Sequence, residues 1–353
     1  MLSPPLKEIV NRIEIDEEGY PVFGGLRIHD ESVLRDLFGS LTRSQTEMPR
    51  SKIVSCLEGK TWVWIDAFDA PLVAQSASLE VGDRVKLGFL GGRVETVDLV
   101  SFEIDEWDRF HASVGAEGIP SVLSRKAQAM LLRDISPRSE APKLSRFRDP
   151  GVLQPGDSLF WSEVYEKHQD GWELGQAHPV LATRDWTRFS EVKRVLVPGA
   201  GRGSDAAFLA RVLPRARVTA LDFAPQARLD ALAKFNEPLS FDYECQDVFE
   251  YLRTQDSASF DLVFEHTFFC AIDPLRRAEY VRELSRVLKP GGCWLGIFFL
   301  LEHSGGPPFA TTQWELREHT RGRFEVFAWE RISHSPSGRT HKELWSEFVT
   351  PSI

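Results

Sequence analysis

The sequence of 353 residues has few cysteines and no long hydrophobic run. Its four cysteines form no Cys-x-x-Cys pair and its histidines share no ligand spacing, so we expect no disulfide framework and no metal site. The longest apolar run, residues 293–301, is about half the ~20 residues that a membrane-spanning helix needs. Near the first residue, prolines and charges stand where a signal peptide would have its apolar core. These features predict a cytoplasmic protein without a membrane partner.

Basic residues are also in the minority. The chain has 42 Lys and Arg against 52 Asp and Glu, a formal charge of -10. An acidic surface repels phosphate backbones, so no nucleic-acid partner is expected. Methionine and tyrosine are scarce, with 3 and 5 residues, whereas 10 tryptophans and 24 phenylalanines are present. This excess of large aromatic residues predicts an aromatic surface with a task beyond core packing.

The length predicts two domains. Residues 136–156 carry four prolines, mixed charge and no periodicity, which is typical of a linker. Residues 1–135 read as a smaller α+β domain, in which Asp30 is expected to cap a short helix and residues 121–134 to form a closing helix. Presenting a substrate, capping an active site and joining two copies as a homodimer all stay open as roles for this domain.

Residues 157–353 alternate between short apolar strands and helices. Such strands imply a mainly parallel sheet covered on both faces, which is a doubly wound, Rossmann-like α/β domain. Strands are expected at 194–198, 217–222, 240–246, 260–265 and 293–300, and helices at 204–213, 224–235 and 274–288.

A glycine-rich turn follows the first of these strands. Gly199, Gly201 and Gly203 allow the backbone to pass close to a ligand at the carboxyl edge of the sheet. Nicotinamide dinucleotides use the pattern G-x-G-x-x-G, but Ser204 occupies the third position here. The tighter G-x-G-x-G pattern favours S-adenosylmethionine, and an NAD-dependent oxidoreductase is the weaker alternative.

Acidic residues follow the next two strands. Asp222 ends the second strand, where a carboxylate accepts hydrogen bonds from ribose hydroxyls. Asp247 and Val248 follow the third strand, where an adenine ring is expected. The spacing therefore predicts an adenosine site along this edge.

At these residues the sequence resembles the thiopurine and thiol S-methyltransferase family, including the plant halide/thiol methyltransferases. The resemblance runs from about Phe160 to the last residue and departs from the family at Tyr165, where Trp is frequent, and at His266, where Tyr is frequent. Four pieces carry it in the family's order: the aromatic residues Trp161, Tyr165 and Trp172, the loop Val195–Gly203, the segment Phe260–Pro274 and the pentapeptide Gly305–Phe309.

The resemblance implies a class I methyltransferase that passes a methyl group from S-adenosylmethionine to a small thiol or selenol, leaving S-adenosylhomocysteine. An in-line displacement by a soft nucleophile depends mainly on positioning, so no strong general base is required. A regulatory or scaffold protein that binds the cofactor without turnover is the alternative. The implied roles are cofactor cover for Trp161, Tyr165 and Trp172, cofactor binding and positioning for Glu265 and His266, and an acceptor pocket from Phe268, Phe269, Phe309 and Trp314.

Overall fold

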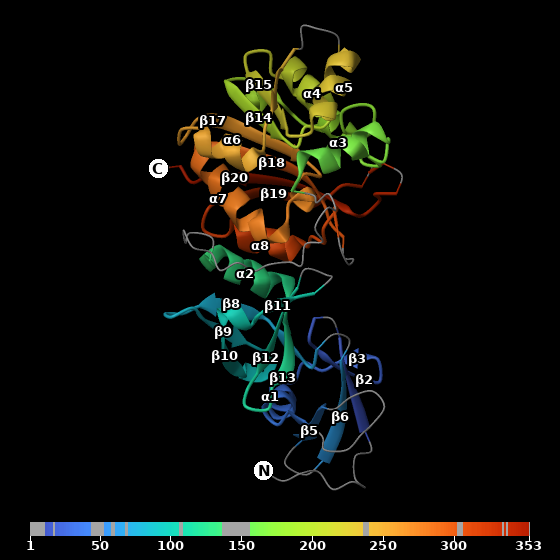
Figure 1. Ribbon diagram of the computed structural model, residues 1–353, viewed down its shortest axis with the longest axis vertical. Helices are drawn as coiled ribbons and strands as arrows, with labels where there is room; N and C mark the ends of the chain where they lie inside the picture. Colours follow the sequence, from blue (N-terminus) through green and yellow to red (C-terminus); the bar gives the residue numbers. More distant parts are fainter. Residues whose placement is uncertain are drawn as a thin grey trace. The chain divides into compact units, whose positions relative to one another are not determined.

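The computed structural model divides the chain into two compact units, residues 1–147 and 148–353, which we describe separately (Figure 1). Of the predicted linker 136–156, only Gly156 lies inside the described residues, so the linker stays a prediction. No helix in the described part of the chain is long and apolar enough to cross a membrane. The structure describes residues 11–16, 18–43, 53–57, 61–67, 70–105, 109–135, 156–235, 240–301, 306–333, 335–336 and 338–352.

The described residues of the first unit form three small sheets and two α-helices. The strand orders are β3-β2-β1-β6-β5-β4, β10-β9-β8 and β11-β12-β13-β7. The helices are α1 (Glu31–Gly39) and α2 (Arg125–Ile135). The strands are β1 (Asn11–Ile15), β2 (Pro21–Phe23), β3 (Leu26–Arg27), β4 (Thr42–Arg43), β5 (Ile53–Leu57), β6 (Thr61–Ala67), β7 (Leu72–Ala74), β8 (Ser76–Leu79), β9 (Arg84–Gly88), β10 (Val94–Asp98), β11 (Glu103–Ile104), β12 (Phe110–Val114) and β13 (Ile119–Leu123).

Two expectations for this unit have different outcomes. Asp30 caps α1 as predicted, because its Oδ1 accepts the N–H groups of Ser32 and Val33. The closing helix, however, begins at Arg125 rather than 121, because residues 121–123 pair with β7 and are buried. A short apolar run gives no clear helix or strand period, which explains the error.

The second unit is built on one seven-stranded sheet. Its order is β16-β15-β14-β17-β18-β20-β19, and β20 runs antiparallel to both neighbours while the other pairs are parallel. The strand predicted at 293–300 begins earlier, at Leu288, which pairs with Phe260. The strands are β14 (Arg194–Pro198), β15 (Arg217–Asp222), β16 (Asp242–Cys245), β17 (Phe260–His266), β18 (Leu288–Phe299), β19 (Glu325–Arg331) and β20 (Glu343–Val349).

Helices cover both faces of this sheet, and α6, α7 and α8 form one connected layer (Figure 1). Side chains alternate along each strand, so Leu196 joins the core beneath α6 and α7 while Val195 and Val197 join the core beneath α4. This confirms the doubly wound, Rossmann-like fold. The helices are α3 (Ser158–Glu166), α4 (Ser204–Val212), α5 (Pro225–Phe235), α6 (Val248–Thr254), α7 (Arg277–Val287) and α8 (Gln313–Thr320), with a 3-10 helix at Pro179–Thr183.

Candidate functional site

The loop between β14 and α4 has the backbone that its glycines predict. Gly199, Gly201 and Gly203 have φ values of 60°, 51° and 77°, in the left-handed region that a Cβ disfavours. A Cβ on Gly199 would come within 2.1 Å of the Phe268 ring, and one on Gly201 within 3.1 Å of the Tyr165 hydroxyl. The loop therefore needs glycine both for its dihedral angles and for the aromatic rings packed on it.

Asp222 ends β15 and holds this loop. Its Oδ2 accepts the N–H of Gly201 and its Oδ1 the N–H of Ala224, both at 3.0 Å. Burial raises the pKa of Asp222, while these N–H groups favour its ionised form. The N–H of Phe223 also favours the ionised carboxylate. A carboxylate has about four lone-pair sites, so not all of them are used and a hydroxyl donor such as that of a ribose can still bind.

The predicted aromatic residues assemble over the loop. Trp161 and Tyr165 of α3 each lie against Trp172, with ring centroids 5.6 and 6.0 Å apart. Tyr165 packs on Ala224 and Ala227, at the turn from β15 into α5. The three aromatic residues thus cover the carboxyl ends of β14 and β15.

Two arginines hold this aromatic segment, residues 161–172, from opposite sides. Arg202, in the glycine loop, donates to the carbonyl of Tyr165 and forms ion pairs with Asp170 and Asp230. Arg339, before β20, donates to the carbonyl of Trp172. Neither role could be predicted from the sequence, because no motif links these arginines to residues 161–172.

Asp247 and Val248 are placed less directly. Asp247 caps α6, because its Oδ1 accepts the N–H groups of Phe249 and Glu250 at 2.9 and 3.1 Å. The Val248 side chain is buried in the core beneath α6 and α7. Any contact of Val248 with a cofactor would therefore involve its backbone, and the adenine role of both residues stays a prediction.

Glu265 and His266 at the end of β17 point to opposite faces of the sheet, because strand side chains alternate. Glu265 is fully buried among aromatic residues, where its Oε2 accepts the Tyr280 hydroxyl at 2.8 Å. Burial raises the pKa of Glu265 to about 8, although the Tyr280 hydroxyl favours the ionised form. At neutral pH this carboxyl is therefore mostly protonated, unlike an ordinary glutamate.

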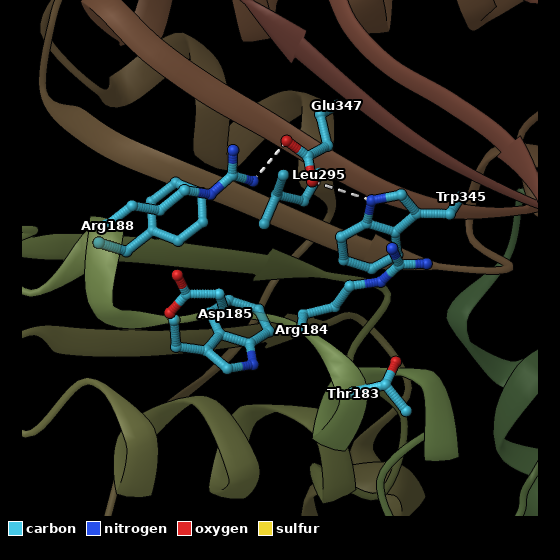
Figure 2. A pocket seen from close by; sticks show the side chains of 9 residues that line it. Thr183, Arg184, Asp185, Arg188, Leu295, Trp345 and Glu347 are labelled. Atoms are coloured by element: carbon cyan, nitrogen blue, oxygen red, sulfur yellow. Dashed lines mark hydrogen bonds and ion pairs between the residues drawn. The ribbon is translucent and has the colours of Figure 1, made fainter.

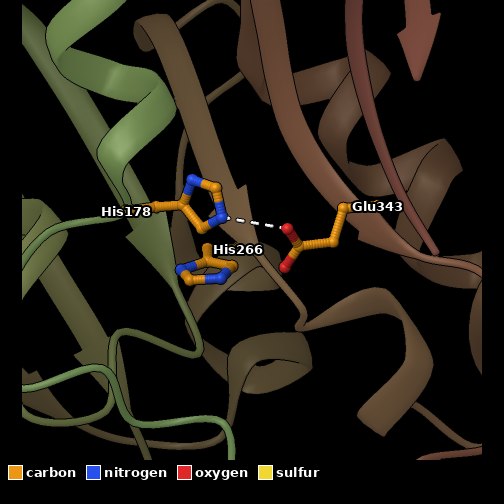
Figure 3. A group of neighbouring side chains, drawn as sticks. All are labelled: His178, His266 and Glu343. Atoms are coloured by element: carbon orange, nitrogen blue, oxygen red, sulfur yellow. Dashed lines mark hydrogen bonds and ion pairs between the residues drawn. The ribbon is translucent and has the colours of Figure 1, made fainter. Parts of the chain in front are cut away.

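His266 faces the other side and belongs to a polar group with His178 and Glu343 (Figure 3). His178 Nε2 lies 3.0 Å from Glu343 Oε2, and His266 Nδ1 lies 2.9 Å from Asp205 Oδ2. Arg339 Nη1 lies 3.2 Å from both His266 Nε2 and Glu343 Oε1. Arg339 thus reaches two of the three members, and the donor atoms of the group already have partners, so we assign no metal to it.

Three of the four residues predicted to line an acceptor pocket lie in one neighbourhood. Phe268 and Phe269 pack in one core cluster. Phe309 is buried, and its N–H donates to the carbonyl of Cys270. Trp314, by contrast, is 56% exposed on the outer side of α8. Its neighbour Leu316 points inward instead, as the 100° rotation per helical residue requires. In the Gly305–Phe309 pentapeptide, Gly305 lies outside the described residues.

A cavity of about 290 Å³ lies against β18 and β20, and none of the predicted site residues lines it (Figure 2). Its two arginines are engaged: Arg188 pairs with Glu347, and Arg184 lies over the Trp345 ring, 4.4 Å from its centroid.

Burial also raises the pKa of Cys270 to about 12, so this thiol is no nucleophile at neutral pH. The predicted site thus remains at the glycine loop.

Comparisons with known proteins identify the family of the second unit. The family model described as thiopurine S-methyltransferase matches residues 157–347, more than half of the chain. The probable thiol methyltransferase 2 of Arabidopsis thaliana is 33% identical over 162 residues, 45% of this chain and 70% of that protein.

Two further relatives extend the comparison. Thiocyanate methyltransferase 1 of the same plant is 32% identical over 157 residues, 42% of this chain and 65% of that protein. The thiopurine S-methyltransferase of Vibrio vulnificus is 26% identical over 213 residues, 54% of this chain and 94% of that protein. The chain thus spans about two thirds of the plant relatives, and the family match begins after residues 1–147. From residue 157 onward, this chain belongs to the thiopurine S-methyltransferase family of S-adenosylmethionine-dependent enzymes.

Proposed function

We propose that this protein transfers a methyl group from S-adenosylmethionine to the sulfur, or the related selenium, of a small soft nucleophile. The observation that carries the proposal is the glycine loop, whose Gly201 N–H is held by Asp222 beneath the aromatic segment. When bound, the cofactor supplies an electrophilic methyl group on a positively charged sulfur.

The residues at the loop fit this cofactor. Three left-handed glycines leave the loop without side chains where a Cβ would collide with neighbouring rings. Asp222 keeps lone pairs for ribose hydroxyls, and Trp161 and Trp172 offer aromatic faces that attract a sulfonium and exclude water. The chain therefore binds, covers and orients the cofactor.

The acceptor class follows from the relatives and from the chemistry. Relatives carry names for thiol, thiocyanate and thiopurine methylation, and all three acceptors present sulfur. A sulfur nucleophile is anionic or readily ionised, so it can attack the methyl group directly. The site then needs no nucleophile of its own, which agrees with the unreactive thiol of Cys270. Homodimerisation through residues 1–135, a cytoplasmic location and the absence of a nucleic-acid partner stay predictions.

Calorimetry with S-adenosylhomocysteine tests the cofactor assignment. Asp222→Ala should weaken binding about 10- to 100-fold, because hydrogen bonds to a charged acceptor contribute about 1.5–3 kcal/mol each. The matched control is Asp242→Ala, which removes an exposed carboxylate on β16 that pairs with Arg217 of β15. Equal affinities for both variants would contradict the ribose role.

Release of S-adenosylhomocysteine tests turnover. The full chain is incubated with S-adenosylmethionine and, separately, an alkyl thiol, a thiopurine, thiocyanate, selenide or iodide. Binding without release with any acceptor would favour the scaffold alternative. Displacement of S-adenosylhomocysteine by NAD would favour the oxidoreductase instead.

A further inference from the structure

The His266 imidazole is held in one defined protonation pattern by its partners. Its Nε2 lies 3.2 Å from Arg339 Nη1, and its Nδ1 lies 2.9 Å from Asp205 Oδ2. A guanidinium only donates hydrogen bonds, so Nε2 must accept and Nδ1 must carry the proton that is donated to Asp205. In this arrangement Nδ1 donates to Asp205, and the lone pair of Nε2 faces Arg339.

Four charged or titratable side chains face His266, one from each element packed on it. They are Asp205 of α4, His178 just before the 3-10 helix Pro179–Thr183, Arg339 in the loop before β20, and Glu343 of β20. Two carboxylates thus face one guanidinium. The group has an excess negative charge, which one additional proton on an imidazole would offset.

His178 is not suited to take that proton. Its Nδ1 accepts the N–H of Val180 at 3.2 Å, so its Nε2 carries the proton shared with Glu343. Protonation of Nδ1 would break the backbone hydrogen bond in a fully buried position. Both nitrogens of His178 are thus committed to the fold.

His266 can accept a proton, because Arg339 has another acceptor. Arg339 Nη1 also lies 3.2 Å from Glu343 Oε1, so it can leave His266 Nε2 and keep a carboxylate partner. Burial opposes ionisation of Asp205, but His266 and the N–H of His178 outweigh it, and the pKa of Asp205 is lowered. Asp205 is thus an anion in contact with the imidazole, as in nucleophile–base–orienter arrangements.

The group borders the glycine loop and the aromatic segment. Asp205 is the second residue of α4, immediately after the glycine loop. Arg339 donates to the carbonyl of Trp172, which belongs to the aromatic segment. β17, which ends at His266, is the direct neighbour of β14 in the sheet. His266 therefore ends the strand beside β14, which leads into the glycine loop.

We propose that His266 is the general base for thiol acceptors and that Asp205 is its positioning residue, an inference that rests on the proposed function. The S–H bond breaks, the proton moves to His266 Nε2, and the electron pair stays on the acceptor sulfur. That sulfur forms the new bond to the methyl carbon, while the bond to the sulfonium breaks and returns its pair to the cofactor sulfur. The products are a methyl thioether, S-adenosylhomocysteine and one proton, which leaves His266 for solvent.

The proposal separates two kinds of acceptor. An alkyl thiol must lose a proton before or during transfer, whereas thiocyanate is an anion with no proton to lose at neutral pH. His266 should therefore matter for the first acceptor and hardly for the second.

The test compares His266→Asn with the unchanged chain on both acceptors. The amide of asparagine keeps a donor towards Asp205 but has no basic nitrogen. We expect kcat/KM to fall about 100-fold or more for an alkyl thiol and less than about 3-fold for thiocyanate. The pH profile for the thiol should then follow the ionisation of the thiol itself. An equal loss for both acceptors, or no loss for either, would overturn the proposal.

His341→Asn is the matched control, because His341 is exposed and has a φ of 63° that asparagine tolerates. Asp205→Asn is the second variant, and it should show a smaller loss with the same preference for thiocyanate. If the unchanged chain releases no S-adenosylhomocysteine with any acceptor, the proposed function fails first.

A binding measurement gives a readout that does not depend on turnover. Alkyl thiol is titrated into the complex with S-adenosylhomocysteine in two buffers of different ionisation enthalpy. The unchanged chain should bind thiolate without releasing a proton to the buffer, because His266 retains it. His266→Asn should release about one proton to the buffer for each thiolate bound, and equal proton release by the two proteins would overturn the proposal.

Discussion

Glu265 and His266 are neighbours in the chain, yet the two faces of the sheet treat them in opposite ways. On one face a carboxyl lies among aromatic side chains, and burial raises its pKa to about 8. On the other face the carboxyls of Asp205 and Glu343 are paired with cations and donors, and their pKa values are lowered despite burial. Burial alone therefore does not decide ionisation, because the partners that remain within reach do.

The comparison also separates structural from chemical roles. On the aromatic face, the carboxyl of Glu265 is neutral and buried away from solvent. Its hydrogen bond with Tyr280 therefore suits it to a structural role at the end of β17. The polar face holds the lone pair, the anion and the cation that proton transfer needs. Three changes test this division, from the largest expected effect to the smallest.

Arg339→Ala removes the cation of the polar face. It leaves Glu343 fully buried with one partner fewer and frees the Trp172 carbonyl. We expect the free energy of unfolding to fall by about 3–5 kcal/mol, measured by denaturant titration. Arg215→Ala, which removes an arginine that is 67% exposed beside the exposed Glu191, should cost less than about 1 kcal/mol. Equal losses would show that charge pairing does not stabilise this face.

Glu265→Gln tests the aromatic face through pH. The folded carboxyl has a pKa of about 8, raised from the ordinary 4.5, so it contributes stability that is fully present below pH 4.5. This contribution is lost as pH rises through 8, because the unfolded chain ionises first. The free energy of unfolding of the variant, relative to that of the unchanged chain, should therefore rise by on the order of 2–4 kcal/mol between pH 5 and pH 8. Denaturant titrations at several pH values measure this difference. Glu325→Gln, at the exposed start of β19, is the control, and parallel curves for Glu265→Gln would refute the raised pKa.

Gly199→Ala tests the ring that connects β17 to the loop. Its Cβ would collide with Phe268 and would also strain a φ of 60°. Gly175→Ala carries a similar strain at a φ of 72°, with nothing within 4 Å of its Cβ. The first variant should lose about 1–3 kcal/mol more than the second and should bind S-adenosylhomocysteine more weakly. Identical losses would mean that the Phe268 ring moves aside freely.

The sequence predicted the fold of the second unit because its signals are local. Apolar strands, helix periodicity and the spacing from Gly199 to Asp222 each span a few to about 20 residues. The glycine loop, Asp222 and the aromatic segment were therefore found together at one edge of the sheet. The exposure of Trp314 could not be predicted, because a single aromatic residue does not reveal which side of a helix it occupies, and its pocket role stays a prediction.

The polar group at His266 could not be found in the same way. Its members stand at 178, 205, 266, 339 and 343, and only the last two have a helical spacing, although they lie in a loop and a strand. Only the order of the strands brings them together, because β20 lies between β18 and β19. The sequence has no short motif that encodes such a meeting.

The bond between Arg339 and Trp172 also bears on how the molecule folds. It joins residues 167 positions apart, and Arg339 lies just before β20, which is placed between β18 and β19 in the sheet. Contacts of such long range form slowly, because the entropy of closing the loop is lost before the contact is gained. During refolding, the hydrogen bond between Arg339 and the aromatic segment should therefore form late, after the parallel strands have assembled. Competence to retain a cofactor would then be among the last properties the chain acquires.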